Sequence, residues 1–191
     1  MLNLVFIYVI MSAIVHFSTH KYSLNLQSRQ QAVGFLVSEN IVANDFLEVI
    51  YQADSKQKIV LFHVLDLMLE KHPDYLNTSL NLYLKKALNE THESLKRCIS
   101  RTIYHQLKNN KNLYNKEQKQ QIVQTMFDWI ILPSAVATRV NAIHILYFLV
   151  DEEDWIKEQL IALIEQNLLL QEPSFVSRGK KILKLLAQRK S

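Results

Sequence analysis

The segment that decides the fold of this chain runs from Ser134 to Leu146 and reads SAVATRVNAIHIL. It carries one basic residue, Arg139, and an apolar residue seven positions later, Leu146. Three other segments repeat this pattern, with Lys58 and Leu65, Lys96 and Ile103, and Arg178 and Leu185. The four basic residues are separated by 38, 43 and 39 positions, which is a period typical of stacked helical hairpins. The sequence therefore predicts an array whose neighbouring hairpins bury a shared core.

The spacing of apolar residues predicts helices throughout the chain. These residues recur at intervals of three and four positions rather than two, which indicates helices rather than strands. Capping residues or prolines precede the apolar stripes and predict helix starts at about Ser28, Asn44, Ser55, Pro73, Thr91, Ser134 and Ser174. We expect helices over residues 135–150 and 174–188, and a polar loop over residues 108–116.

Two segments resemble known repeat proteins. The run from Ser134 to Leu146 resembles a HEAT-like repeat helix, with Arg139 at the usual basic position. The segment PSFVSRGKKILKLL, which begins at Pro173, resembles the closing segment of a group of small, uncharacterised bacterial α-α superhelical proteins. The resemblance covers about residues 28–188 and implies an all-α, right-handed α-α superhelix of about four HEAT/armadillo-like hairpins. It implies no activity. Some such sequences carry an adenylosuccinate lyase label, but this chain is too short for that enzyme and lacks its glycine-rich loop.

The N-terminal segment is expected to differ from the remainder of the chain. We expect residues 24–191 to form one HEAT-like domain and residues 1–23 to form a separate apolar segment. Only Asn3 and Ser12 interrupt the apolar run of residues 1–15. As a helix this run would span roughly 22 Å, which is short of the roughly 30 Å hydrocarbon core of a bilayer. Three interpretations stay open: a signal or membrane anchor, a helix packed on the array, or an extension that precedes a start at Met11.

Composition excludes several classes of site. The chain has two glycines, Gly34 and Gly179, whereas phosphate-binding loops need several glycines close together. Its single cysteine, Cys98, excludes an internal disulfide and a cysteine-rich zinc site, and favours a cytoplasmic location. No G-x-S-x-G or H-E-x-x-H motif occurs. We therefore expect no catalytic, cofactor or metal site, although an enzyme with a dispersed site would leave no linear motif.

The histidines are expected to have structural roles. His16 and His20 are four positions apart and can share a helix face, but two imidazoles alone seldom hold a metal. His63 and His144 lie within apolar ladders. We expect both to be neutral imidazoles of a core or an interface, bonded to backbone carbonyls.

Positive charge is concentrated in the second half of the chain. Residues 96–119 hold seven Lys or Arg and one acid, and residues 174–191 hold six and no acid. If both segments share one face, that face attracts phosphates or an acidic protein. The candidate partner-binding residues are Lys96, Arg97, Arg101, Arg139, Arg178, Lys180, Lys181 and Lys184. The repeated basic residues also allow a structural interpretation, in which each meets a carboxylate of the adjacent repeat.

The repeat pattern and the missing motifs together predict a non-catalytic scaffold or adaptor that binds another protein. An alternative is a nucleic-acid-binding module that uses the basic half of the chain, with steeply salt-dependent affinity. An enzyme with a dispersed site is a third hypothesis. A membrane partner is expected only if residues 1–15 act as an anchor.

Overall fold

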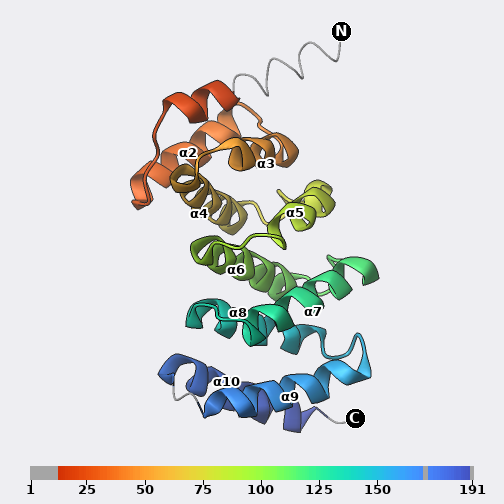
Figure 1. The fold of residues 1–191 in the computed structure, drawn as a ribbon. Coiled ribbons are helices and arrows are strands. Elements are labelled where there is room, and N and C mark those ends of the chain that lie inside the picture. The colour runs from red at the N-terminus through yellow and green to blue at the C-terminus, as the bar shows by residue number, and fades with distance from the viewer. Residues whose placement is uncertain (1–12, 170–171, 190–191) are drawn as a thin grey trace. The chain divides into compact units, whose positions relative to one another are not determined.

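The computed structural model describes residues 13–169 and 172–189, and every regular element within these ranges is a helix (Figure 1). The all-α class that the apolar spacing indicated is confirmed. Contacts between residues divide the chain into two compact units, which we call unit 1 (Met1–Lys86) and unit 2 (Ala87–Ser191). The boundaries expected at residues 1–23 and 24–191 stay predictions.

Unit 1 packs its helices around aromatic side chains. It contains α2 (Leu26–Ser38), α3 (Ala43–Gln52), α4 (Ser55–Lys71), the short 3-10 helix η1 (Asn77–Ser79) and α5 (Leu80–Ala87), whose last residue is the first of unit 2. Helices α2 and α3 both pack against α4. Residues 13–19 are also helical and bury Phe17, whose ring centroid lies 5.4 Å from that of Phe46 and 5.6 Å from that of Phe35.

The helix starts of unit 1 differ from the expected ones in four places. Helix α2 begins at Leu26, two residues before the start expected at about Ser28, because the side chain of Asn25 caps it. Asp54 caps α4 in place of Ser55, because its Oδ1 accepts hydrogen bonds from the backbone N–H groups of Lys56 and Gln57. Helix α3 begins at Ala43, one residue before the cap expected at Asn44. No helix starts at Pro73. The chain turns there instead, and the hydroxyl of Tyr75 donates to the carbonyl of Ile41 over 2.8 Å.

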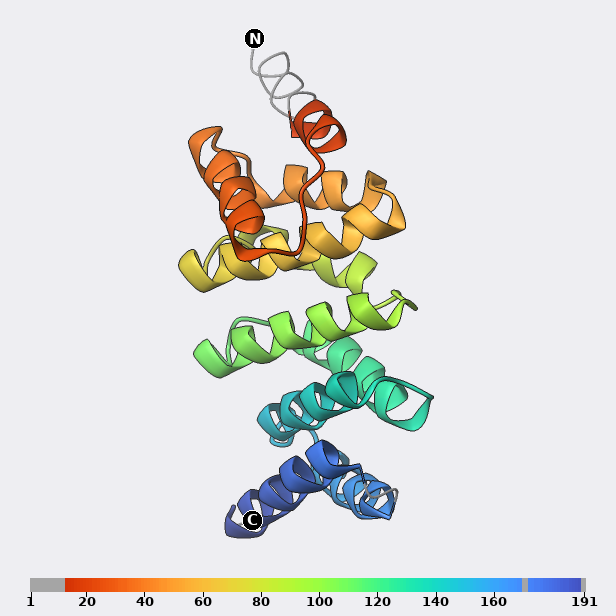
Figure 2. The ribbon, with the colours of Figure 1, turned by 90° about the vertical axis from the view of Figure 1, so that its left-hand side faces the viewer.

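Unit 2 is organised around one central helix. It contains α6 (Glu93–Asn109), α7 (Lys116–Ile131), α8 (Val136–Leu149), α9 (Asp154–Leu168) and α10 (Pro173–Gln188). The other four helices all contact α8. Helices α6, α8 and α10 lie side by side in one layer, and α7 and α9 form a second layer behind it (Figures 1 and 2).

Local capping explains most helix boundaries of unit 2. Asn115 caps α7 in a capping box with Gln118, so the expected loop at residues 108–116 is found at 110–115. Helix α10 ends at Gln188 as expected and begins at Pro173, one residue early. His92 rather than Thr91 caps α6. Ser134 does not cap α8, because the carboxylate of Glu93 accepts the hydrogen bond from the N–H of Ala135.

The structure bears on the expected membrane anchor only in part. None of the helices within residues 13–169 and 172–189 combines the length and the apolarity that crossing a bilayer requires. Most of the apolar run at residues 1–15 lies outside the described residues.

Candidate partner-binding face

Charged residues of unit 2 are segregated between its two helix layers. Helices α6, α8 and α10 carry nine Lys or Arg and one acid, Glu93. Helices α7 and α9 carry three Lys or Arg and five acids. Because the two layers turn opposite sides to solvent, one side of the unit is strongly positive and the other slightly negative (Figure 1).

We call the solvent side of the layer formed by α6, α8 and α10 the basic face. We define it by ten side chains that are exposed or half-buried. They are Arg97, Arg101, Tyr104, Lys108, Lys111, Asn141, His144, Phe148, Arg178 and Lys181.

Helix α6 contributes a stripe of three cations and one ring. Arg97, Arg101, Tyr104 and Lys108 follow one another at intervals of four, three and four residues, which places them along one side of the helix. Arg97 and Lys108 are exposed, and the two residues between them are half-buried. The opposite side of α6, which includes Ile99, is buried in the core. The stripe therefore presents positive charge on both sides of the Tyr104 ring.

Helix α8 places rings beside this stripe. The centroid of the His144 ring lies 5.4 Å from that of Tyr104, with the two rings at 65°, and the centroid of Phe148 lies 5.8 Å from that of Tyr104. The side chain of Asn141 ties the two helices together, because its Nδ2 donates to Ser100 Oγ over 3.0 Å. These contacts make α6 and α8 one continuous surface of rings and cations.

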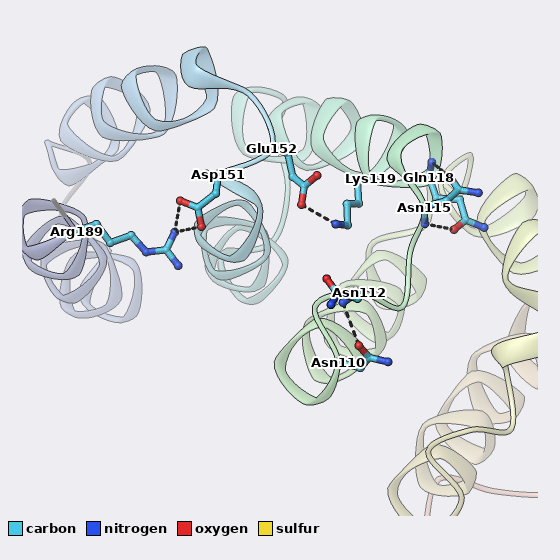
Figure 3. Close-up of polar contacts among 8 residues, drawn as sticks. All are labelled: Asn110, Asn112, Asn115, Gln118, Lys119, Asp151, Glu152 and Arg189. Atoms are coloured by element: carbon cyan, nitrogen blue, oxygen red, sulfur yellow. Dashed lines mark hydrogen bonds and ion pairs between the residues drawn. The ribbon is translucent and has the colours of Figure 1, made fainter. Parts of the chain in front are cut away.

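The α6–α7 loop adds a cation above the Phe148 ring. Lys111 Nζ lies 6.0 Å from the centroid of that ring, within the range of a cation–π interaction. The loop is held on both sides of Lys111 (Figure 3). Asn110 Oδ1 accepts from the N–H of Asn112 over 3.0 Å, and the capping box at Asn115 follows.

Helix α10 adds two exposed cations that act on His144. Arg178 and Lys181 are three residues apart and so lie one above the other on the helix. Burial lowers the pKa of His144, and the positive charges of Arg178 and Lys181 lower it further, to about 4. The imidazole is therefore neutral at pH 7 as expected, but within the described residues it contacts the Tyr104 ring rather than the expected backbone carbonyl.

Lys96, one of the expected candidates, is taken up by structural contacts. Its Nζ lies 2.9 Å from Glu93 Oε1 and 3.4 Å from Ser134 Oγ, and its side chain is only 12% exposed. Partial burial pushes the pKa of Glu93 upward, but hydrogen bonds from the N–H of Ala135 and from Lys96 outweigh this effect and hold the pKa below its ordinary value. The hydrogen bonds from Ala135 to Glu93 and from Lys96 to Ser134 therefore fasten the start of α6 to the segment that precedes α8.

Arg139 is likewise taken up by structural contacts. Its guanidinium forms an ion pair with Glu172 and lies over the Phe175 ring, 5.2 Å from the centroid. The Arg139 side chain is 10% exposed. This pair joins α8 to the start of α10, which is the role that the structural interpretation of the repeated basic residues predicts. We therefore leave Lys96 and Arg139 out of the basic face.

Two further candidates on α10 lie outside the centre of the basic face. Lys180 is exposed, but it is two positions from Arg178 and so points about 200° around the helix from it. Lys184 is exposed three positions after Lys181 and lies at the edge of the face. The candidates that the structure brings together on one face are thus Arg97, Arg101, Arg178 and Lys181.

Acidic residues near the end of the layer are neutralised within the unit. Asp151 Oδ2 lies 3.1 Å from Arg189 Nη1, and Glu152 Oε1 lies 2.6 Å from Lys119 Nζ (Figure 3). The guanidinium of Arg189 also lies over the Tyr147 ring, 4.5 Å from its centroid. Lys119 and Arg189 thus hold both carboxylates in ion pairs. The carboxylates therefore cancel little of the positive charge of the basic face.

The cavities of unit 2 lie away from the basic face. One, of about 390 Å³, lies between α7 and α9 and is lined by Val123 and Trp155 together with the paired Lys119 and Glu152. Another, of about 580 Å³, lies between α9 and α10 beside Ile161. Across residues 13–169 and 172–189, no three His, Cys, Asp or Glu side chains come close enough together to hold a metal ion.

Several residues of the basic face were not identified from the sequence. Tyr104, Lys108, Lys111 and Phe148 were not singled out, and His144 was expected to serve packing alone. A helical wheel of residues 93–109 places Tyr104 and Lys108 beside Arg97, so their position on the same side of the helix was predictable from the sequence. The approach of Lys111 to Phe148 depends on the conformation of a loop, and no sequence spacing reports it.

Comparisons with known proteins identify no relative of this chain. No protein-family model, no curated protein and no solved structure matches this chain. The resemblance to HEAT-like repeat proteins therefore stays a prediction.

Proposed function

We propose that this chain is a non-catalytic interaction module built from HEAT-like hairpins, and that its basic face binds an acidic segment of a partner protein. One observation carries the proposal: six Lys or Arg lie on the basic face, and Glu93, the one acid on α6, α8 and α10, is paired with Lys96. A face of one sign accelerates encounter with partners of the opposite sign and disfavours partners of the same sign.

The packing of unit 2 supports the HEAT-like interpretation. Helix α7 packs against α8, and α9 packs against α10, so the helices that carry Arg139 and Arg178 each have the preceding helix behind them. The hydrogen bond of Lys96 to Ser134 and the ion pair of Arg139 with Glu172 join successive helices of the front layer. Arrays of this kind leave one long helical face free for partners. We infer a right-handed superhelix of about four hairpins.

The rings of the basic face favour a protein segment that has apolar as well as acidic side chains. Tyr104 and Phe148 are half-buried, and the exposed cations Arg97, Lys108 and Arg178 lie around them. Tyrosine and arginine contribute strongly to binding where they lie at the centre of an interface. An Asp/Glu-rich segment with an apolar residue meets both the charge and the rings.

A second candidate partner is single-stranded nucleic acid. The observation in its favour is the same interleaving of cations with rings, because phosphates can pair with the cations while bases stack on the rings. The two candidates differ in salt dependence, since each phosphate that is neutralised releases counterions.

Charge reversal on matched surfaces tests the proposal. The test variant combines Arg97→Glu, Arg178→Glu and Lys181→Glu. The control variant combines Lys116→Glu, Lys157→Glu and Lys180→Glu, which change the net charge equally but lie outside the basic face. Binding of a fluorescent poly-aspartate peptide and of oligothymidylate is measured by anisotropy at about 50 mM and about 200 mM salt.

We expect the test variant to lose at least about tenfold in peptide affinity, because three cations that attract the peptide become repulsive. The control variant is expected to lose much less. Tighter binding of oligothymidylate, with a steep salt slope, would establish nucleic acid as the partner. Equal losses in the two variants, or no binding of either probe, would refute the basic face as a binding site.

A further inference from the structure

We infer that His144, Arg178 and Lys181 form an anion-binding subsite on the basic face, and that a carboxylate bound there brings a proton from solvent onto the His144 imidazole. The inference rests on the proposed function, because the carboxylate belongs to the acidic segment of the partner. Docking on the basic face then becomes stronger as the pH falls.

The three side chains come from neighbouring helices of one layer. His144 lies on the side of α8 that the core leaves open, because its side chain is only half-buried whereas those of Ile143 and Ile145 are buried. Helix α6 bounds it through the Tyr104 ring, and α10 packs against α8 and carries Arg178 and Lys181. A carboxylate can accept two hydrogen bonds from the planar fork of an arginine and others from an ammonium or an imidazolium.

The charged groups around His144 leave the subsite without an anion of its own. Arg178 and Lys181 on α10 are the charged groups that act on the imidazole, and the Tyr104 side chain that faces it from α6 is neutral. Helices α7 and α9 belong to the layer behind α8. Within residues 13–169 and 172–189, neither Arg178 nor Lys181 forms an ion pair.

The nearest groups along the face do not change this balance. Lys111 is a further cation and lies above the ring of Phe148, which is one helical turn after His144 on α8. Asp151 lies two turns beyond His144 in the chain, and Arg189 already binds its carboxylate. An incoming carboxylate is therefore the anion that the two cations of α10 lack.

Proton uptake follows from the charges. In the free protein, burial and the two cations hold the pKa of His144 at about 4. A bound carboxylate offsets the field of Arg178 and Lys181 and accepts a hydrogen bond from the protonated ring, so the pKa rises toward its ordinary value of about 6.5. Protonation and binding then favour each other. With a pKa of about 6.5 in the complex, affinity at about pH 5.5 exceeds that at about pH 7.5 by roughly tenfold.

Calorimetry on the full chain tests the inference with the poly-aspartate peptide. Titrations at about pH 7.5 and about pH 5.5, in two buffers of different ionisation enthalpy, give both the affinity ratio and the number of protons taken up. NMR of the unmodified chain, with and without peptide, follows the pKa of the His144 ring directly and requires no substitution.

Two histidine variants separate the effect of His144 from that of the other histidines. His144→Gln is expected to reduce the affinity ratio from roughly tenfold to about twofold or less. His72→Gln is the control, because His72 is exposed and lies in unit 1, outside the basic face of unit 2. This variant is expected to keep the full ratio.

The outcomes distinguish the inference from the proposed function. If the peptide binds but His144→Gln keeps the full ratio, and the pKa of His144 does not rise on binding, the subsite is refuted and the proposed function stands. If the peptide binds at neither pH, both are refuted. If only oligothymidylate binds with a His144-dependent ratio, the occupant is a phosphate and the carboxylate assignment is wrong.

Discussion

The two glycines of the chain provide a matched pair of substitutions that tests the packing of α9 against α10. Gly34 lies within α2 and Gly179 lies within α10. A Cβ atom at Gly34 would meet no other atom within 4 Å. At Gly179 the same atom would lie 2.9 Å from Ile164 Cγ2 and 3.3 Å from Leu168 Cδ2. Replacement by alanine therefore adds a methyl group to open space at one position and to a filled interface at the other.

The expected effects on the free energy of unfolding have opposite signs. Glycine within a helix costs about 0.5–1 kcal/mol relative to alanine, so Gly34→Ala is expected to stabilise by that amount. Gly179→Ala gains the same term but overfills the interface, which typically costs about 1–3 kcal/mol. Ile164 is buried and β-branched, so it cannot turn aside cheaply. We expect a net loss of about 0.5–2 kcal/mol for Gly179→Ala.

Urea denaturation measures both effects. The two tryptophans, Trp129 and Trp155, lie in α7 and α9, so their fluorescence reports the unfolding of unit 2 and suits Gly179→Ala. Far-UV circular dichroism reports the loss of helix in both units, so it includes the unfolding of α2 and suits Gly34→Ala. Equal stabilisation by the two substitutions would refute the close approach of α9 and α10 at Gly179.

Three further predictions concern buried polar groups. Glu172→Gln is expected to lower the free energy of unfolding by about 1–3 kcal/mol, and by more than Arg139→Met, because it leaves a buried guanidinium without its anion. A larger loss of unfolding free energy for Arg139→Met, measured by urea denaturation, would contradict this. Tyr114→Phe is expected to cost about 1–2 kcal/mol, since the buried hydroxyl donates to the Gln106 amide oxygen; an unchanged urea midpoint would count against that bond. Burial, then the neighbouring His20, lowers the pKa of His16, so the folded state favours the neutral ring. The stability this contributes is complete above about pH 6.5 and falls as the pH decreases from there; hydrogen exchange of residues 13–19 at about pH 7 and about pH 5 measures it, and equal protection would refute it.

Helix boundaries were predictable from the sequence where the determining contacts are local. Asn115 and Gln118 are three residues apart and satisfy each other's backbone groups, so the start of α7 can be found from the sequence. The start expected at Pro73 failed because the hydroxyl of Tyr75 donates to a carbonyl 34 residues earlier. Similarly, Glu93 lies 42 residues before the N–H of Ala135 that it caps. A contact across such a separation leaves no pattern in a short window of sequence.

The candidate site was likewise predictable from the sequence only in part. Its positive charge was predictable, since residues 96–119 and 174–191 are rich in bases. Which cations are available to a partner was not, because Lys96 and Arg139 belong to the same repeat pattern as Arg178. The structure binds Lys96 and Arg139 in ion pairs and leaves Arg178 exposed.

By itself, the sequence determined that this protein is all-helical, because burial of one side of a helix imposes a period of three to four residues that any short segment displays. Only the tertiary structure decided that α6, α8 and α10 share one layer and that their bases form one face with Tyr104, His144 and Phe148. The reason is physical. The sign of the charge on a surface depends on which helices pack side by side, and that choice is made by contacts between residues about 40 positions apart.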